Sequence, residues 1–177
     1  MRIFKVIILS ICFIQISAIS QTSQYYIPEK HDILKELSGN WDVIFAANAE
    51  EATAPAVGRG TAVGKINYDG VLVELEAEMK YQVGEANNKI IIGYDINQKK
   101  YYFLTYNSQG RSPALFFGDY NSNKNEYRFL NKENGEVISF ITLTFTREDK
   151  FIIRSFVKSN GKDKKTLEIA YIKESKE

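Results

Sequence analysis

The sequence predicts an all-β fold, an antiparallel up-and-down barrel of about ten strands that follows one short helix. Apolar and polar residues alternate in short segments, and turn residues separate them at the spacing of about 8–12 residues expected of β-sandwiches and barrels. The segments are joined by hairpin-length connections, with no long crossover. We favour a closed barrel over a two-sheet sandwich because closure removes the two exposed edges of an open sheet.

The first twenty residues have the features of a secretory signal peptide. Arg2 and Lys5 precede an apolar run over residues 6–16, and the small residues Ala18 and Ser20 occupy the −3 and −1 positions of a cleavage site. The run is shorter than the roughly 20 residues that span a bilayer. We therefore expect an exported protein that keeps no integral membrane segment after cleavage.

The rest of the chain divides into a lead and a barrel. Residues 21–38 form a polar lead that ends in a short helical candidate, His31–Leu37, in which Leu34 and Leu37 share one face. Gly39 is suited to the position after the end of this helix. We expect the barrel domain to occupy residues 39–177.

Ten strands follow, and the third has the clearest pattern. From Val71 to Lys80, apolar residues alternate with Glu74, Glu76 and Glu78, which predicts one buried face and one solvated face. The other expected strands are Asn40–Ala47, Val57–Asn67, Lys89–Asp95, Lys100–Asn107, Pro113–Tyr120, Glu126–Asn131, Val137–Thr146, Lys150–Lys158 and Lys164–Lys173.

Turn residues lie between the expected strands. They tolerate positive φ or bond to the backbone that follows, and they include Asp69-Gly70, Asn87-Asn88, Asn97-Gln98, Asn134-Gly135 and Asn160-Gly161. Asp95 is expected to start its turn by accepting hydrogen bonds from the backbone beyond it. A longer loop over residues 48–56 is expected at one mouth of the barrel.

Composition argues against several kinds of chemistry. The formal net charge is +1, with no basic stripe of the kind that binds nucleic acid. The one cysteine, Cys12, leaves with the signal peptide, and the one histidine, His31, precedes the barrel. We therefore expect no catalytic triad, no metal site and no cofactor. Glu74, Glu76 and Glu78 share a strand face that suits calcium in principle, but alternation favours a solvated outer face.

The candidate ligand-binding residues are mostly aromatic. An aromatic side chain at the start of the first strand, Trp41, is expected to close the barrel floor more often than to contact a ligand. Arg154 is interpreted as an inward charge that stacks on an aromatic ring or pairs with an acid ligand. The full candidate set is Trp41, Tyr94, Tyr101, Phe103, Phe116 and Arg154.

Short motifs carry a resemblance to a known family. Leu37-Ser38-Gly39-Asn40-Trp41, Gly93-Tyr94-Asp95 and Tyr101 resemble the motifs of the bacterial lipocalin-like domain of unknown function 1579. Many members then carry a Trp and an Asp where this chain has Thr105 and Asn107. The resemblance covers nearly all of residues 21–177. It implies a lipocalin-like barrel, and the signal peptide adds the expectation that this bacterial protein lies in the periplasm or outside the cell.

Three functions are compatible with these observations. The first is an exported barrel that binds one small, mainly apolar molecule. The second is an enzyme, a hydrolase or isomerase, that uses carboxylate and Tyr groups on the same scaffold. The third is an envelope interaction protein with a filled barrel. The contents of the interior distinguish them, because a cavity of about 300 Å3 or more that is lined by aromatic residues favours binding. The oligomeric state does not follow from the sequence.

Overall fold

The computed structural model describes residues 32–47, 56–67, 72–81, 84–108 and 111–174. The expected signal peptide, His31, the loop over residues 48–55 and the Asp69-Gly70 turn lie outside these residues. Within the described part, no helix is long and apolar enough to cross a membrane.

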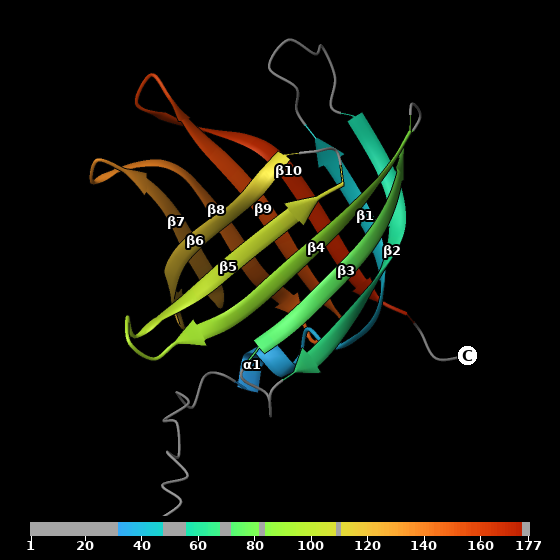
Figure 1. Ribbon diagram of the computed structural model, residues 1–177. Helices are drawn as coiled ribbons and strands as arrows, with labels where there is room; N and C mark the ends of the chain where they lie inside the picture. The colour runs from blue at the N-terminus through green and yellow to red at the C-terminus, as the bar shows by residue number, and fades with distance from the viewer. Residues whose placement is uncertain (1–31, 48–55, 68–71, 82–83, 109–110, 175–177) are drawn as a thin grey trace, which may run out of the picture.

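The described chain is a closed antiparallel barrel, and each strand pairs with its neighbours in sequence (Figure 1). The last strand pairs with the first, with Val43 opposite Tyr171, which closes the sheet. The prediction of an up-and-down barrel is therefore confirmed. The elements are α1 (Asp32–Lys35), β1 (Gly39–Ala47), β2 (Ala56–Asn67), β3 (Leu72–Tyr81), β4 (Gly84–Asp95), β5 (Lys100–Asn107), β6 (Arg111–Asn121), β7 (Glu126–Glu133), β8 (Glu136–Arg147), β9 (Lys150–Ser159) and β10 (Lys162–Lys173).

The short helix α1 lies at one end of the barrel, which we call the helix end (Figure 1). Leu34 and Leu37 are fully buried there, as expected of one apolar helix face. The Leu37 carbonyl lies against Gly64 of β2, where a Cβ atom would stand 2.0 Å from the carbonyl oxygen. Glycine at this position therefore allows the end of the helical segment to contact the sheet directly.

Most strand positions agree with the sequence pattern, and β4 is the main correction. The Asn87-Asn88 pair was expected to be a turn, but β4 begins at Gly84 and both residues pair with β3. Asn88 breaks the apolar alternation because it faces the barrel interior, where its Oδ1 accepts a hydrogen bond of 3.1 Å from Thr105. A polar residue on an inner face was thus mistaken for a turn residue.

Three of the expected turns, at Asn97-Gln98, Asn134-Gly135 and Asn160-Gly161, are confirmed. Asn134-Gly135 and Asn160-Gly161 both have positive φ at both residues, which matches the twist of a tight hairpin. The Asp95 carboxylate accepts hydrogen bonds from the backbone N–H groups of Asn97 and Gln98, at 2.9 and 3.1 Å. These local contacts set the register of the strands that they connect.

The ladder between β6 and β7 is shorter than its neighbours. It contains five residue pairs, from Asn121 opposite Glu126 to Phe117 opposite Leu130, and it ends there. By contrast, β5 pairs with β6 as far as Arg111, and β7 pairs with β8 as far as Glu133. Figure 1 shows the β7–β8 hairpin turning away from the beginning of β6.

Candidate functional site

The barrel interior is the candidate site, and its helix end is filled with aromatic rings. Phe151 stacks on Tyr171 with ring centroids 4.4 Å apart and meets Trp41 edge to face at 4.7 Å. Tyr127 meets Tyr101 at 4.8 Å in the same layer. All five rings are buried, so this half of the barrel is a packed core.

Trp41 takes part in closing the helix end. Its indole Nε1–H donates a hydrogen bond of 3.0 Å to the Leu37 carbonyl, which ties β1 to the end of the helical segment. The side chain is only 1% exposed. This position agrees with the floor role that the sequence favoured, and it leaves the indole donor committed to the protein.

The four other aromatic candidates face the interior from β4, β5 and β6. Tyr94 and Tyr101 contact each other near the helix end, with ring centroids 5.0 Å apart. Phe103 and Phe116 lie further along the barrel and meet edge to face at 6.3 Å. The fold thus brings these four together as a row, with Phe116 nearest to the opposite end.

The half of the barrel away from α1, which we call the open half, is lined mainly by small residues on β2 and β4–β9, whereas Phe45 and Tyr81 meet edge to face at 5.9 Å at its β1–β3 side. Two of its inward alanines, Ala77 and Ala86, are buried. Other inward positions there are only half-buried: Gly60, Asn88, Thr105, Ala114, Ser139 and Ser155. Because these residues lie on the inner face and still contact solvent, water reaches the interior from this end. A ten-stranded barrel is also wider than the eight-stranded barrels that side chains can just fill.

Arg154 is a correction, since it was interpreted as an inward charge. It lies on the outer face, because Phe151 and Ile153 of the same strand point into the core. Its Nε donates to the Glu168 carboxylate of β10 at 2.8 Å. Hydrogen bonds from Arg154 and Lys165 hold the pKa of Glu168 below its usual value. The acid that pairs with Arg154 is thus a side chain of the sheet, and the pair fastens β9 to β10 outside the interior.

The stacking that was considered for Arg154 occurs at a neighbouring arginine. The Arg128 guanidinium of β7 lies over the Phe140 ring at 4.2 Å. Phe140 in turn stacks on Phe156 with ring centroids 4.6 Å apart. This outer-face cluster therefore gives β7, β8 and β9 a shared apolar contact outside the barrel core.

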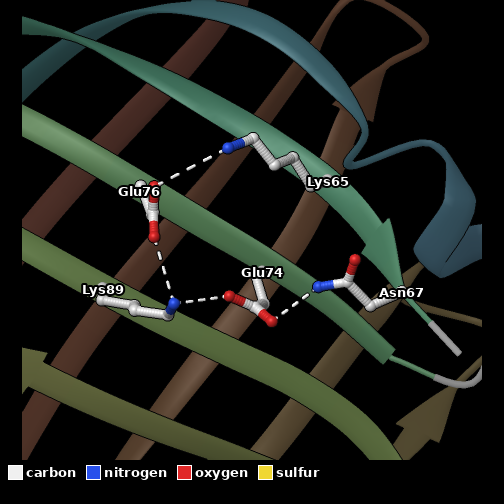
Figure 2. Close-up of polar contacts among 5 residues, drawn as sticks. All are labelled: Lys65, Asn67, Glu74, Glu76 and Lys89. Atoms are coloured by element: carbon white, nitrogen blue, oxygen red, sulfur yellow. Dashed lines mark hydrogen bonds and ion pairs between the residues drawn. The ribbon is translucent and has the colours of Figure 1, made fainter.

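The acidic row of β3 lies on the outer face, as expected, and two of its members, Glu74 and Glu76, pair with lysines (Figure 2). The Lys89 ammonium lies between Glu74 and Glu76, at 2.5 and 3.1 Å from their carboxylate oxygens. Glu74 also accepts a 2.6 Å hydrogen bond from Asn67, and the contact with Lys89 lowers its pKa. These contacts use the carboxylates in ion pairs across β2, β3 and β4.

A groove of about 620 Å3 runs along the outer face beside these ion pairs, with Lys89 and Tyr106 among its lining residues. Its walls mix both signs of charge with an aromatic ring. Among the described residues, no group of three or more His, Cys, Asp or Glu side chains is placed to hold a metal ion.

Comparison with known protein families gives one match. Residues 28–173 match the family described as Protein of unknown function (DUF1579). The chain belongs to this family. The match spans α1 and all ten strands, so the barrel is the DUF1579 domain, and its lipocalin-like shape agrees with the resemblance seen in the motifs. A search of curated proteins found no match.

Sequence reasoning missed two features of the interior in this DUF1579 protein. The first is a row of small residues on β2 that recurs at every second position. It marks inward positions without large side chains, at Gly58, Gly60, Ala62 and Gly64. The second is the Tyr171 hydroxyl, which is fully buried and has no hydrogen-bond partner among the described residues. No sequence signal distinguishes this tyrosine from its neighbours.

Proposed function

We propose that this protein is an exported barrel that binds one small, mainly apolar molecule in its open half and performs no chemistry of its own. The observation that carries the proposal is the contrast between the two halves of the interior. Aromatic rings pack against one another across the helix end, whereas the other end has one aromatic pair, Phe45 with Tyr81, and small, half-exposed side chains on most of its remaining strands. Bound molecules in proteins occupy such concave, mainly apolar spaces.

The open half offers apolar walls with a few polar groups. Phe103 and Phe116 separate it from the packed helix end, and Ile141 and Phe45 add buried apolar surface. Ser139, Ser155 and the hydrogen-bonded pair of Asn88 and Thr105 supply polar groups near the open end. Apolar burial at about 25 cal/mol per Å2 gives a lipid-sized molecule useful affinity without further polar contacts.

A fluorescent fatty-acid probe tests the proposal. Wild-type protein should bind the probe, and Ala114→Trp should weaken binding by about tenfold or more because it adds bulk to an inner position of the open half. Val63→Trp, at an exposed position on the outer face, is the matched control and should leave the affinity unchanged. Phe116→Ala should alter the affinity without abolishing the fold.

The result that overturns the proposal is equally specific. If wild-type protein binds no such probe and its interior is shown to be filled, the protein is better described as an interaction protein of the envelope. Export has its own test, the N-terminal sequence of protein isolated from outside the cytoplasm. Mature material should begin near Gln21, and a retained Met1 would contradict export.

A further inference from the structure

The ladder between β6 and β7 ends before either strand does, and we call this place the split. Beyond Phe117 and Leu130 the two strands no longer pair, although each still pairs with its other neighbour. If the ladder continued, Leu115 would lie opposite Lys132. The described residues therefore contain one split in an otherwise closed sheet, and it lies in the open half.

The sequence prevents the two strands at the split from pairing. Pro113 of β6 lies in the stretch without a β7 partner, and a proline has no N–H to donate to a ladder. The register between β5 and β6 shifts between Thr105 and Asn107, where β6 contains one extra residue beside Pro113, which marks a bulge in β6. Prolines, bulges and lysines are the features that keep exposed strand edges from adding another strand. The split is thus a specified feature, and it is poorly suited to binding an extended peptide.

An apolar groove lies at the split. It has a volume of about 390 Å3, and its walls are Leu115, Phe117 and Leu130 on the outer face, together with Asn131, Lys100 and Lys132. Leu115 is 47% exposed, which is high for a leucine within a strand. Asn131, which belongs to the inward row of β7, also lines the groove, so the groove lies beside the point where the two strands separate.

The two lysines of the groove differ in their contacts. The Lys100 ammonium is paired with the Asp119 carboxylate at 2.9 Å. Lys132 is exposed and has no ion-pair or hydrogen-bond partner among the described residues. A free ammonium at the rim of an apolar groove suits a ligand with one carboxylate and an apolar chain.

We infer that the split between β6 and β7 is the entrance for an amphipathic carboxylate, with Lys132 attracting the carboxylate and Leu115, Phe117 and Leu130 contacting the chain. This inference rests on the proposed binding function and adds to it the class of the ligand and its route. The molecule enters from the side, past Asn131, and comes to lie in the open half.

Cross-linking the split tests the route. In a Cys12→Ser background, Leu115→Cys and Lys132→Cys are joined by a short bis-maleimide, and stopped-flow fluorescence follows an 11-dansylamino-undecanoate probe. The joined protein should bind and release the probe about tenfold more slowly than the same variant with each thiol capped separately, because a route affects rates and leaves the affinity nearly unchanged. The control pair, Thr61→Cys and Glu78→Cys, lies opposite across the intact β2–β3 ladder and should leave both rates unchanged.

Lys132 is tested separately by Lys132→Gln. Association of the carboxylate probe should slow about threefold or more at low salt, and association of the matching alcohol should not change. Lys162→Gln, at the β9–β10 hairpin, is the matched control. If wild-type protein binds the probe but the cross-link leaves both rates unchanged, the entrance is refuted and the proposed function stands. If wild-type protein does not bind the probe at all, the proposed function itself fails.

Discussion

The Tyr171 hydroxyl is a buried polar group whose position is set by the rings around it. Phe151 stacks on the ring, and the residue is fully buried on the inner face of β10. Burial raises the pKa of this tyrosine well above its usual value, so the hydroxyl stays protonated. A buried hydroxyl without a partner costs about 1–3 kcal/mol of folding free energy.

We therefore expect Tyr171→Phe to raise the free energy of unfolding by about 1 kcal/mol, because the ring is kept and only the unpaired hydroxyl is lost. Urea unfolding with an unchanged m-value measures the effect. Tyr120→Phe is the control, since that hydroxyl donates a 2.6 Å hydrogen bond to Asn125 and its loss should destabilise the protein. A clear loss of stability in Tyr171→Phe would mean that a buried water or a ligand satisfies the hydroxyl.

The contact between α1 and β2 depends on the absence of a side chain at Gly64. A Cβ atom there would stand 2.0 Å from the Leu37 carbonyl oxygen, which also accepts the Trp41 indole hydrogen bond. Backbone atoms on both sides of the contact leave little room for adjustment. A methyl group at this position would therefore push against the Leu37 carbonyl. It would displace the end of the helical segment and disturb the indole hydrogen bond.

Gly64→Ala should lower the free energy of unfolding by about 2–4 kcal/mol, since it combines overpacking with the loss of a buried hydrogen bond. Trp41 is the only tryptophan in the chain, so its fluorescence should also shift to the red as water reaches the indole. Gly135→Ala is a useful comparison, because no atom lies near that Cβ position and only the positive φ opposes it. Unchanged tryptophan fluorescence in Gly64→Ala would contradict this account of the helix end.

The sequence was informative about elements whose signal is local. Strict alternation located β3, and the Asn-Gly pairs located two hairpins because only a few residues accept positive φ. The sequence-based prediction was wrong where the position of a residue in the folded barrel differs from what its neighbours in sequence suggest. Asn88 has turn chemistry but lies in a strand, and Arg154 has apolar neighbours in sequence but faces outward.

Site prediction was limited for the same reason. Alternation along each strand predicted that the aromatic residues point inward. It does not predict how far along the barrel axis each of them lies. Whether Phe116 lies near an open end or a packed end depends on the stagger of all ten strands. The split at β6 and β7 depends on where pairing ends, and Pro113 is the one sequence signal that pointed to it.

At the scale of the whole molecule, stability comes from a core that is rich in tyrosine and from a sheet that is closed almost completely. Tyr101, Tyr127 and Tyr171 are all at most 5% exposed. Burial is the main reason that the pKa of each of these tyrosines is raised. The folded protein therefore holds three phenolic protons that the unfolded chain releases at ordinary alkaline pH.

These raised pKa values predict loss of stability in alkali. Below the unfolded tyrosine pKa of about 10, both states keep the protons and the full stability is present. As the pH rises above that value, the unfolded chain loses protons and the folded protein does not, so each buried tyrosine lowers the free energy of unfolding by up to about 1.4 kcal/mol per pH unit. Urea midpoints should be constant from pH 8 to about 9.5 and then fall steeply. The tyrosinate absorbance of the native protein should appear at higher pH than that of the unfolded chain.

Tyr127→Phe should make the fall of the urea midpoint with pH less steep, because one of the three protons no longer contributes. If the free energy of unfolding stays constant up to pH 11, the three hydroxyls ionise equally in the folded and unfolded states. That result would contradict their burial in the barrel.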